Sequence, residues 1–287
     1  MRIAVPKDES MVKSPKVELL FKPGNTYRNR LGDYRVLTIS GPKMLVEYLA
    51  NGRRQELDVA IAERIWENIQ AEENPWPAPA PEGGTIVTLA HLRAGIQRWF
   101  SKCPPWPTDF HNAFYQALQA LRDNGELSWD YLVDQLASWS AVRPYSKEAI
   151  YQLGLPHLDN LTQNMGVLVA GHGGRIPDLN NVRWSDLQPL FAVASQIKPS
   201  DSPVFAGKLC HFLLPNSYPV ADNELVGIDR EDYRSYWLRC AYGWTFSTQQ
   251  NDLIAELRSA MTSAAIADYP WSAKITELCH IGVRYRQ

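Results

Sequence analysis

The chain has 287 residues, of which 45% are hydrophobic, so it can bury a full core, and we expect two domains. It carries 29 Lys and Arg against 31 Asp and Glu; residues 1–70 hold 12 against 9, which leaves 17 against 22 for the remainder. An acidic larger part excludes a uniformly basic surface there, so nucleic acid could contact only a local basic patch. No apolar run approaches the roughly 20 residues of a membrane helix, and the N-terminus lacks a secretory pattern. We therefore expect a cytoplasmic protein with no membrane partner.

Residues 24–58 are expected to form short antiparallel strands. Apolar residues mostly alternate in GDYRVLTIS and GPKMLVEYL, and Asn51-Gly52 favours a type I′ hairpin turn. A short amphipathic helix is expected over 60–70. Its isoleucines recur every four residues and could cover one side of the sheet: Ile61, Ile65 and Ile69. We predict that residues 1–70 form a small antiparallel β-barrel-like module, which resembles SH3-like or Tudor-like barrels in size and strand pattern.

A Pro-rich linker is expected over 71–84, followed by a helical domain over 85–287. Apolar periodicity predicts about ten helices, at 88–100, 109–125, 128–140, 147–155, 158–171, 184–197, 204–214, 223–243, 250–264 and 272–285. Helix caps are expected at Ser128, Ser146 and Ser185, with Gly125 ending a helix. The predicted fold class is α+β and multidomain, with an antiparallel β module followed by an all-α bundle.

Residues suited to metal binding are scattered. The four cysteines lie far apart, and none of the six histidines forms a closely spaced ligand pair. We expect no metal and no cofactor. Most of the ten tryptophans lie at helix-compatible apolar positions and are expected in the core. Trp106, within the loop sequence CPPWP, could instead stack on a base or another ligand.

One stretch places a lone amine and a lone carboxylate in apolar surroundings. Residues 202–227 read SPVFAGKLCHFLLPNSYPVADNELVG, with Lys208 in the apolar run and Asp222 after a Pro-containing turn. Considered alone, Asp222 could simply cap the helix expected from 223, while Lys208 extends to the surface. A catalytic pair is the alternative. An amine in an apolar segment can act as a nucleophile, and a carboxylate can stabilise a developing positive charge.

This stretch resembles the centre of the helix-hairpin-helix DNA glycosylase superfamily, and more closely bacterial proteins with the 8-oxoguanine glycosylase fold. Pro203 and Lys208 have the spacing of the Pro and Lys in the family's hairpin, and YPVAD at 218–222 is similar to its aspartate segment. KITELCHIG at 274–282 fits the same pattern. The resemblance implies a helix-hairpin-helix glycosylase-like bundle, in which Lys208 is the amine nucleophile and Asp222 the shared aspartate.

The implied function is a DNA glycosylase that flips out a damaged or modified base and cleaves its N-glycosidic bond, with or without lyase activity. The partner would be double-stranded DNA, and modified phage DNA in anti-phage defence is one suggested target. We expect the base-binding pocket to use Trp106, His211, Tyr242, Trp244 and Phe246. DNA contacts are expected at Arg28, Arg30, Arg53, Arg54 and Gly207.

A non-catalytic protein that binds DNA or another protein and keeps the same scaffold is the alternative. Val204 and Ala206 stand where the family's hairpin has glycines, whose backbone N–H groups approach a DNA phosphate. The discriminating observation is whether the Lys208 and Asp222 side chains share a site.

Overall fold

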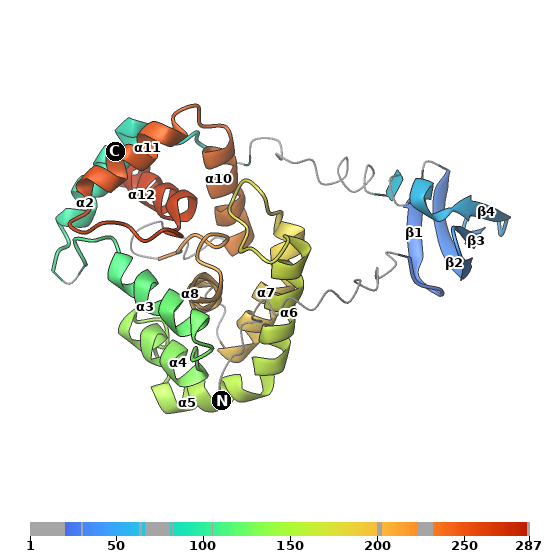
Figure 1. Cartoon of the computed structure of the whole chain (residues 1–287), viewed down its shortest axis with the longest axis horizontal. Helices are drawn as coiled ribbons and strands as arrows, with labels where there is room; N and C mark the ends of the chain where they lie inside the picture. Colours follow the sequence, from blue (N-terminus) through green and yellow to red (C-terminus); the bar gives the residue numbers. More distant parts are fainter. Residues whose placement is uncertain are drawn as a thin grey trace. The chain divides into compact units, whose positions relative to one another are not determined.

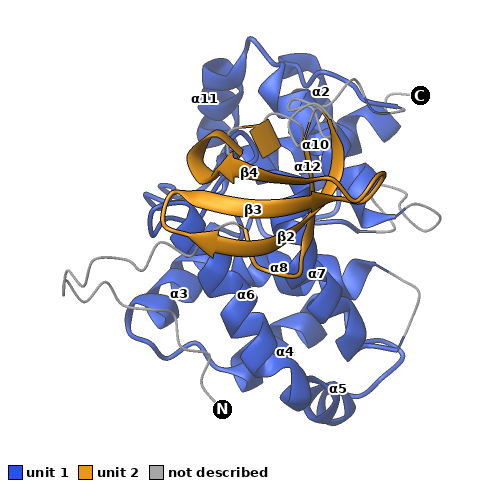
Figure 2. Ribbon diagram, turned by 90° about the vertical axis from the view of Figure 1, so that its right-hand side faces the viewer, with its two compact units in different colours: residues 1–8, 80–287 blue, residues 9–79 orange. Residues whose placement is uncertain are grey.

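A computed structural model describes residues 21–29, 31–62, 65–66, 81, 83–104, 106–199, 203–222 and 232–285. The chain divides into two compact units, coloured separately in Figure 2: residues 9–79, here the sheet unit, and residues 80–287 with residues 1–8, here the helical unit. The division falls between Pro79 and Ala80, inside the segment expected as a linker. Most of that segment lies outside the described residues.

The sheet unit contains a four-stranded antiparallel meander with the strand order β1-β2-β3-β4. The strands are β1 (Thr26–Asn29), β2 (Gly32–Ser40), β3 (Lys43–Tyr48) and β4 (Arg54–Asp58). In the described residues, each strand pairs with the next one along the chain, so β1 and β4 are the edges. The predicted antiparallel sheet at the N-terminal side of an α+β chain is therefore confirmed.

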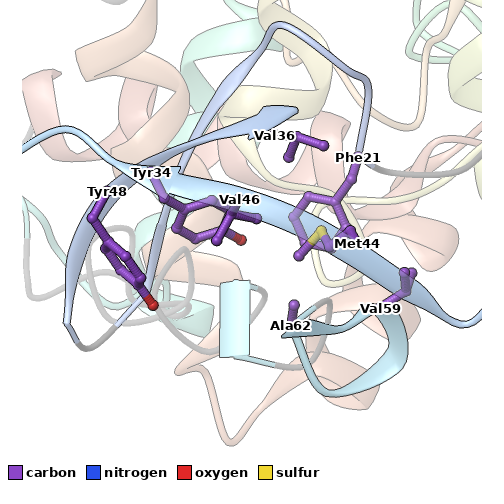
Figure 3. Packing of buried hydrophobic residues seen from close by; sticks show 8 residues of the cluster. All are labelled: Phe21, Tyr34, Val36, Met44, Val46, Tyr48, Val59 and Ala62. Carbon is purple, nitrogen blue, oxygen red and sulfur yellow. The ribbon is translucent and has the colours of Figure 1, made fainter. Parts of the chain in front are cut away.

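One face of this sheet carries a small apolar core, because successive side chains on a strand point to opposite faces. Figure 3 shows its buried members: Phe21, Tyr34, Val36, Met44, Val46, Tyr48, Val59 and Ala62. Helical residues 59–62 and 65–66 contribute Val59 and Ala62, with Trp66 packed against them. The expected packing of Ile61 is wrong, since this side chain is 53% exposed. Ile69 lies outside the described residues.

The turn between β3 and β4 also differs from the expected two-residue type I′ turn. Only Gly52 of the Asn51-Gly52 pair has a positive φ, at +67°. Asn51 instead accepts a hydrogen bond from the Arg53 backbone N–H through Oδ1, at 3.0 Å. This side-chain contact allows a longer loop, in which Tyr48 N–H donates to the Arg53 carbonyl at 2.9 Å.

The described part of the helical unit contains ten α-helices and one 3₁₀ helix, in agreement with the expected number. They are α2 (Leu89–Phe100), α3 (Asn112–Asp123), α4 (Trp129–Ser138), α5 (Lys147–Gly154), η1 (Leu155–His157), α6 (Leu158–Gly171), α7 (Trp184–Ile197), α8 (Val204–Leu213), α10 (Tyr233–Thr245), α11 (Gln250–Ala260) and α12 (Trp271–Tyr285). The helix expected over 223–243 is described only from Tyr233 onward; residues 223–231 lie outside the described part.

Two helices form the centre of this unit. Every residue from Phe205 to Leu213 in α8 is buried, and so is every residue from Ser272 to Cys279 in α12. α12 packs against α2, α10 and α11, whereas α8 packs against α4 and α7. Figure 1 shows α8 between the group containing α10 and α12 and the group formed by α3, α4 and α5. Charged side chains on either helix are therefore placed inside the protein.

The cap predictions are partly confirmed. Ser128 and Ser146 accept hydrogen bonds from the N–H groups of Tyr131 and Ala149 at the starts of α4 and α5. Gly125, after α3, has a φ of +65°. Ser185 is not a cap, because α7 begins one residue earlier. There the Asp186 carboxylate accepts a hydrogen bond from the Arg183 backbone N–H at 3.0 Å.

Candidate functional site

Lys208 is held inside the helical unit on α8. Its side chain is 5% exposed, because the rest of α8 is buried on all sides. The ammonium group donates a hydrogen bond to the Trp139 carbonyl oxygen at 2.8 Å and contacts Asp222 Oδ2 at 3.2 Å. The expected lone amine therefore has two partners, and one of them is the carboxylate singled out in the sequence.

Asp222 is positioned by the segment that joins α8 to α10. Two tyrosine hydroxyls from the first turn of α10 donate to this segment, Tyr233 to the Pro219 carbonyl at 2.5 Å and Tyr236 to the Val220 carbonyl at 2.8 Å. The Asp222 side chain is 33% exposed. The carboxylate thus reaches the surface, while the ammonium that it contacts lies beneath it. Residues 223–231, the start of the helix that Asp222 was expected to cap, lie outside the described residues.

Two lysines hold the chain that follows α4. Ser140 has a φ of +57°, which ends the helix and leaves the Trp139 carbonyl free to accept from Lys208. Lys198, at the end of α7, donates to the Ala141 and Arg143 carbonyls at 2.8 and 2.5 Å. Burial lowers the pKa of Lys198, and the positive charge of Lys208 lowers it further. Two ammonium groups, those of Lys198 and Lys208, therefore lie near residues 139–143.

A second charged network lies next to the Lys208–Asp222 pair. Lys274 and Glu277 of α12 form an ion pair at 2.6 Å with side chains 0% and 4% exposed. Lys274 Nζ also lies 3.5 Å from His111 Nδ1. The His111 ring stacks on the Trp139 ring, with centroids 4.3 Å apart. Trp139 therefore links the two networks, through its ring to His111 and through its carbonyl to Lys208.

The electrostatics of the two networks are coupled. Burial raises the pKa of Glu277, the positive charges of Lys274 and Lys208 lower it, and the negative charge of Asp222 raises it. Burial also lowers the pKa of His111 well below its usual value, and the charges of Lys274 and Lys208 act in the same direction. With His111 neutral, the ammonium groups of this region, Lys198, Lys208 and Lys274, are matched in number by the carboxylates of Asp109, Asp222 and Glu277.

His211 does not face a ligand. Its residue is 0% exposed, and both ring nitrogens have protein partners. Nδ1 donates to the Tyr218 carbonyl at 2.6 Å, while Nε2 accepts from the Tyr115 hydroxyl at 2.9 Å. Since Nδ1 carries the proton, this histidine is a structural link between α8, the Tyr218 segment and α3. The expected substrate-binding role is corrected for this reason.

The expected aromatic pocket is not assembled around the pair. Tyr242, Trp244 and Phe246 lie at the C-terminal end of α10, whereas the first turn of α10 contacts the segment before Asp222. Trp244 is buried and 4% exposed. Phe246, 41% exposed, packs beside Tyr242 with ring centroids 4.7 Å apart. Trp106 is partly buried and packs on Trp99, with centroids 4.5 Å apart.

Gly207 is a packing residue rather than a backbone contact for DNA. Its N–H donates within α8 to the Pro203 carbonyl at 2.9 Å. A Cβ at this position would lie 2.7 Å from the Tyr233 ring. The absence of a side chain therefore allows α10 to approach α8, and the expected DNA-binding role of Gly207 is corrected.

The predicted arginines of the sheet unit differ in their pairing. Arg28 binds Asp33 on the neighbouring strand through Nε at 2.5 Å, and Arg54 binds Glu47 through Nε at 3.1 Å. Arg53 is exposed in the β3–β4 turn. Arg30 lies outside the described residues. Two of these cations therefore already have an acidic neighbour, although exposed pairs of this kind are weak.

The charged residues that sequence reasoning missed are His111, Lys274 and Glu277. Lys274 and Glu277 are three residues apart in the helix sequence SAKITELCHIG, whose other residues are mostly apolar or small. This spacing places both charges on one face of the helix and could have predicted a buried ion pair. His111 gave no comparable signal, because it occupies a short loop before α3. Its proximity to Lys274 depends on packing between segments more than 150 residues apart.

Comparisons of the chain with protein-family profiles, curated proteins and solved structures gave no match. Within the described ranges, no group of three or more His, Cys, Asp or Glu side chains is arranged to hold a metal ion. In the same ranges, no helix combines the length and apolarity needed to cross a bilayer.

Proposed function

We propose that this protein is a cytoplasmic DNA glycosylase, in which Asp222 and Lys208 act on the bond between a flipped base and its sugar. In this proposal α7 and α8 are the two helices of the helix-hairpin-helix element, and the sheet unit is an SH3-like module that adds affinity for DNA. The substrate is double-stranded DNA with a damaged or modified base, including bases of the kind found in modified phage DNA.

One observation carries the proposal: Lys208 Nζ and Asp222 Oδ2 lie 3.2 Å apart although fourteen residues separate them in sequence. The capping interpretation, in which Lys208 extends to the surface, does not require this contact. The resemblance of residues 202–227 to the glycosylase superfamily places an amine and a carboxylate at one site. The partly exposed carboxylate beside a buried ammonium group agrees with that arrangement.

Asp222 can supply the main electrostatic contribution. Cleavage of an N-glycosidic bond builds positive charge on the sugar, and a carboxylate at the surface of the site stabilises that charge and orients an attacking water. In this route the C1′–N bond electrons leave with the base, and water supplies the new bond to C1′. Lys208 then acts by fixing the position of the carboxylate.

A second route uses Lys208 as the nucleophile. Its ammonium group must first lose a proton, and the Asp222 carboxylate at 3.2 Å is an acceptor within reach. The free amine then forms a bond to C1′ while the C1′–N bond electrons leave with the base, which takes up a proton. This route leaves a covalent enzyme–DNA intermediate, whereas the water route leaves none.

The test is base release from a panel of duplexes with damaged or modified bases, measured as abasic sites on a gel. We expect Asp222→Asn to slow release by about 10²- to 10³-fold, because the substitution removes the charge and nearly preserves the shape. Asp232→Asn is the matched control, because Asp232 caps α10 through the Ser235 N–H. Equal rates for wild type and Asp222→Asn would refute the assignment of this site.

Borohydride trapping separates the two routes. If Lys208 is the nucleophile, wild type forms a trapped adduct with DNA and Lys208→Gln forms none. If water attacks, wild type forms no adduct but still releases base.

The second candidate is a non-catalytic protein that keeps this scaffold. It is favoured by the two hydrogen-bond partners of the Lys208 ammonium, which a purely structural ion pair would also show. In that case the purified protein binds DNA or a protein partner but releases no base from any duplex.

A further inference from the structure

His111 occupies an unusual position at the start of α3. It has a φ of +68°, and the preceding Phe110 has a φ of +51°. Residues other than glycine rarely adopt this left-handed backbone conformation. The Asp109 carboxylate holds this conformation by accepting hydrogen bonds from the backbone N–H groups of His111 and Ala113, at 3.1 and 2.9 Å. Strained backbone of this kind persists where surrounding contacts fix it, and it is concentrated at functional sites.

The surroundings of the His111 ring fix its orientation. One face stacks on Trp139 at 4.3 Å, and Trp99 approaches edge-on at 5.3 Å. Behind the ring, Lys274 Nζ lies 3.5 Å from Nδ1, at the long end of hydrogen-bonding distance. Lys274 is itself held by Glu277 at 2.6 Å. Nδ1 of this imidazole therefore contacts the buried Lys274–Glu277 ion pair.

This contact determines which nitrogen carries the proton. An ammonium group can only donate, so Nδ1 must be the acceptor, and the proton of the neutral ring then lies on Nε2. In the part of the chain that the structure describes, no residue accepts a hydrogen bond from Nε2. The His111 residue is partly exposed, so its surroundings are not closed on every side. His111 thus presents one N–H donor whose acceptor is not supplied by the described protein.

The donor belongs to the same region as the proposed reaction. The His111 ring stacks on the Trp139 ring, and the Trp139 carbonyl accepts a hydrogen bond from Lys208 at 2.8 Å. The charge of Lys208 also acts on the His111 ring, so the two groups are close enough to interact electrostatically. The departing base gains negative charge on its ring nitrogens or carbonyl oxygens as the bond breaks. A hydrogen bond that strengthens with that charge accelerates the step.

We propose that His111 Nε2–H donates a hydrogen bond to the departing base, and that Lys274 with Glu277 positions this donor. The inference rests on the proposed glycosylase function and adds the group that stabilises the leaving base. Asp222 acts on the sugar, which becomes positive, and His111 acts on the base, which becomes negative. The bond electrons move to the base, and the imidazole keeps its proton throughout, so water protonates the released base.

The experiment compares two variants at one backbone position. His111→Phe keeps an aromatic ring for stacking on Trp139 and removes the N–H donor. His111→Gln loses the ring but keeps an amide N–H. Both are unbranched at Cβ, so each carries a similar strain at positive φ. Single-turnover base release is measured for each, together with affinity for the intact duplex.

We expect His111→Phe to slow the chemical step by about 10- to 100-fold with little change in affinity, because one hydrogen bond to a developing charge is lost. His111→Gln should remain within about tenfold of wild type. Equal rates for His111→Phe and wild type would overturn the inference while wild-type release still upholds the proposed function. Equal losses in both variants would also overturn it, because they indicate a packing role. Absence of release by the wild type would overturn both proposals.

The positioning role of Lys274 has a separate readout. In the wild type, ¹⁵N spectra of the His111 ring should show the neutral form with its proton on Nε2 throughout pH 6–8. In the double variant Lys274→Met/Glu277→Leu, which removes both charges, the proton should distribute over both nitrogens and base release should slow. A wild-type ring with its proton on Nδ1 would contradict the assignment. An unchanged tautomer in the double variant would rule out Lys274 as the positioning residue.

Discussion

Gly95 of α2 and Gly282 of α12 lie where the two helices meet backbone to backbone. A Cβ on Gly95 would overlap the carbonyl oxygen of Leu278, and a Cβ on Gly282 would overlap that of His91 and lie 2.8 Å from the Gly95 nitrogen. Neither contact involves a flexible side chain that could move aside. The pairing therefore fixes the distance between α2 and the helix that carries Lys274 and Glu277.

We expect Gly95→Ala and Gly282→Ala each to lower the free energy of unfolding by about 3 kcal/mol or more, because a methyl group must push two helix backbones apart. Urea unfolding followed by circular dichroism measures the effect. Gly166→Ala in α6 is the matched control, since no atom lies within 4 Å of a Cβ there. It should be neutral or stabilising by up to about 1 kcal/mol. Unchanged stability in Gly95→Ala would contradict this close approach.

The sequence predicts those parts of the fold that depend on local patterns. Alternation of Met44, Val46 and Tyr48 gives the buried face of β3, and Ser128 and Ser146 mark helix starts that the structure has. Ser185 failed as a cap because α7 already begins at Trp184, with Arg183 at the cap position and its N–H donating to the Asp186 carboxylate. Such competition between neighbouring polar residues is decided by small geometric differences that the sequence does not reveal.

The site is predictable only where its residues share one segment. Lys208 and Asp222 could be paired from residues 202–227, because their separation is short and their surroundings are apolar. His111 and Lys274 meet across 163 residues. Their contact depends on how α3 and α12 pack, and no local pattern encodes it. The pocket predicted from Tyr242, Trp244 and Phe246 failed for the same reason, since closeness in sequence to Asp222 does not bring the far end of α10 near it.

Removing one partner of the buried Lys274–Glu277 pair should destabilise the protein strongly. We expect Lys274→Met to lower the free energy of unfolding by about 3–5 kcal/mol, because Glu277 is left charged and buried. The double variant Lys274→Met/Glu277→Leu should recover most of this loss. Because Lys274 lowers the raised pKa of Glu277, its removal raises that pKa further. The folded variant then binds a proton more readily than the unfolded chain, so its deficit should shrink as the pH falls from 7 to 5.

A deficit for the double variant as large as that of Lys274→Met would contradict this account. Such a result would show that the folded protein needs the ion pair itself. An unpaired buried charge would then not be the cause of the loss in Lys274→Met.

Stability should fall in mild acid because His211 is buried as a neutral group. Burial, followed by the charge of Lys274, lowers its pKa to about 3, and the Tyr218 carbonyl opposes this only in part. The unfolded histidine titrates near pH 6.5, so between these values the unfolded chain holds one more proton. The stability present above pH 6.5 is therefore lost as the pH falls, by up to about 1.4 kcal/mol per pH unit for this group.

The measurement is the slope of unfolding free energy against pH between 7 and 5. His211→Gln, which cannot titrate, should reduce this slope by about one proton. The amide can still accept from the Tyr115 hydroxyl, so the variant is a fair comparison. A slope equal to that of wild type would show that His211 is not buried in its neutral form.

The sheet unit should contribute to DNA affinity through charge, and its arginines should contribute unequally. Each cation that neutralises a phosphate increases the dependence of binding on salt by about one unit of logarithmic slope. The structure describes no ion pair for the exposed Arg53, whereas the Arg28 charge is already matched by Asp33. We therefore expect Arg53→Ala to reduce the salt slope by about one and Arg28→Ala to reduce it less. Deletion of the sheet unit, residues 9–79, should weaken binding more than either substitution. If full-length and truncated proteins bind a duplex equally across 50–200 mM salt, the sheet unit does not contact DNA, and a protein partner becomes its better assignment.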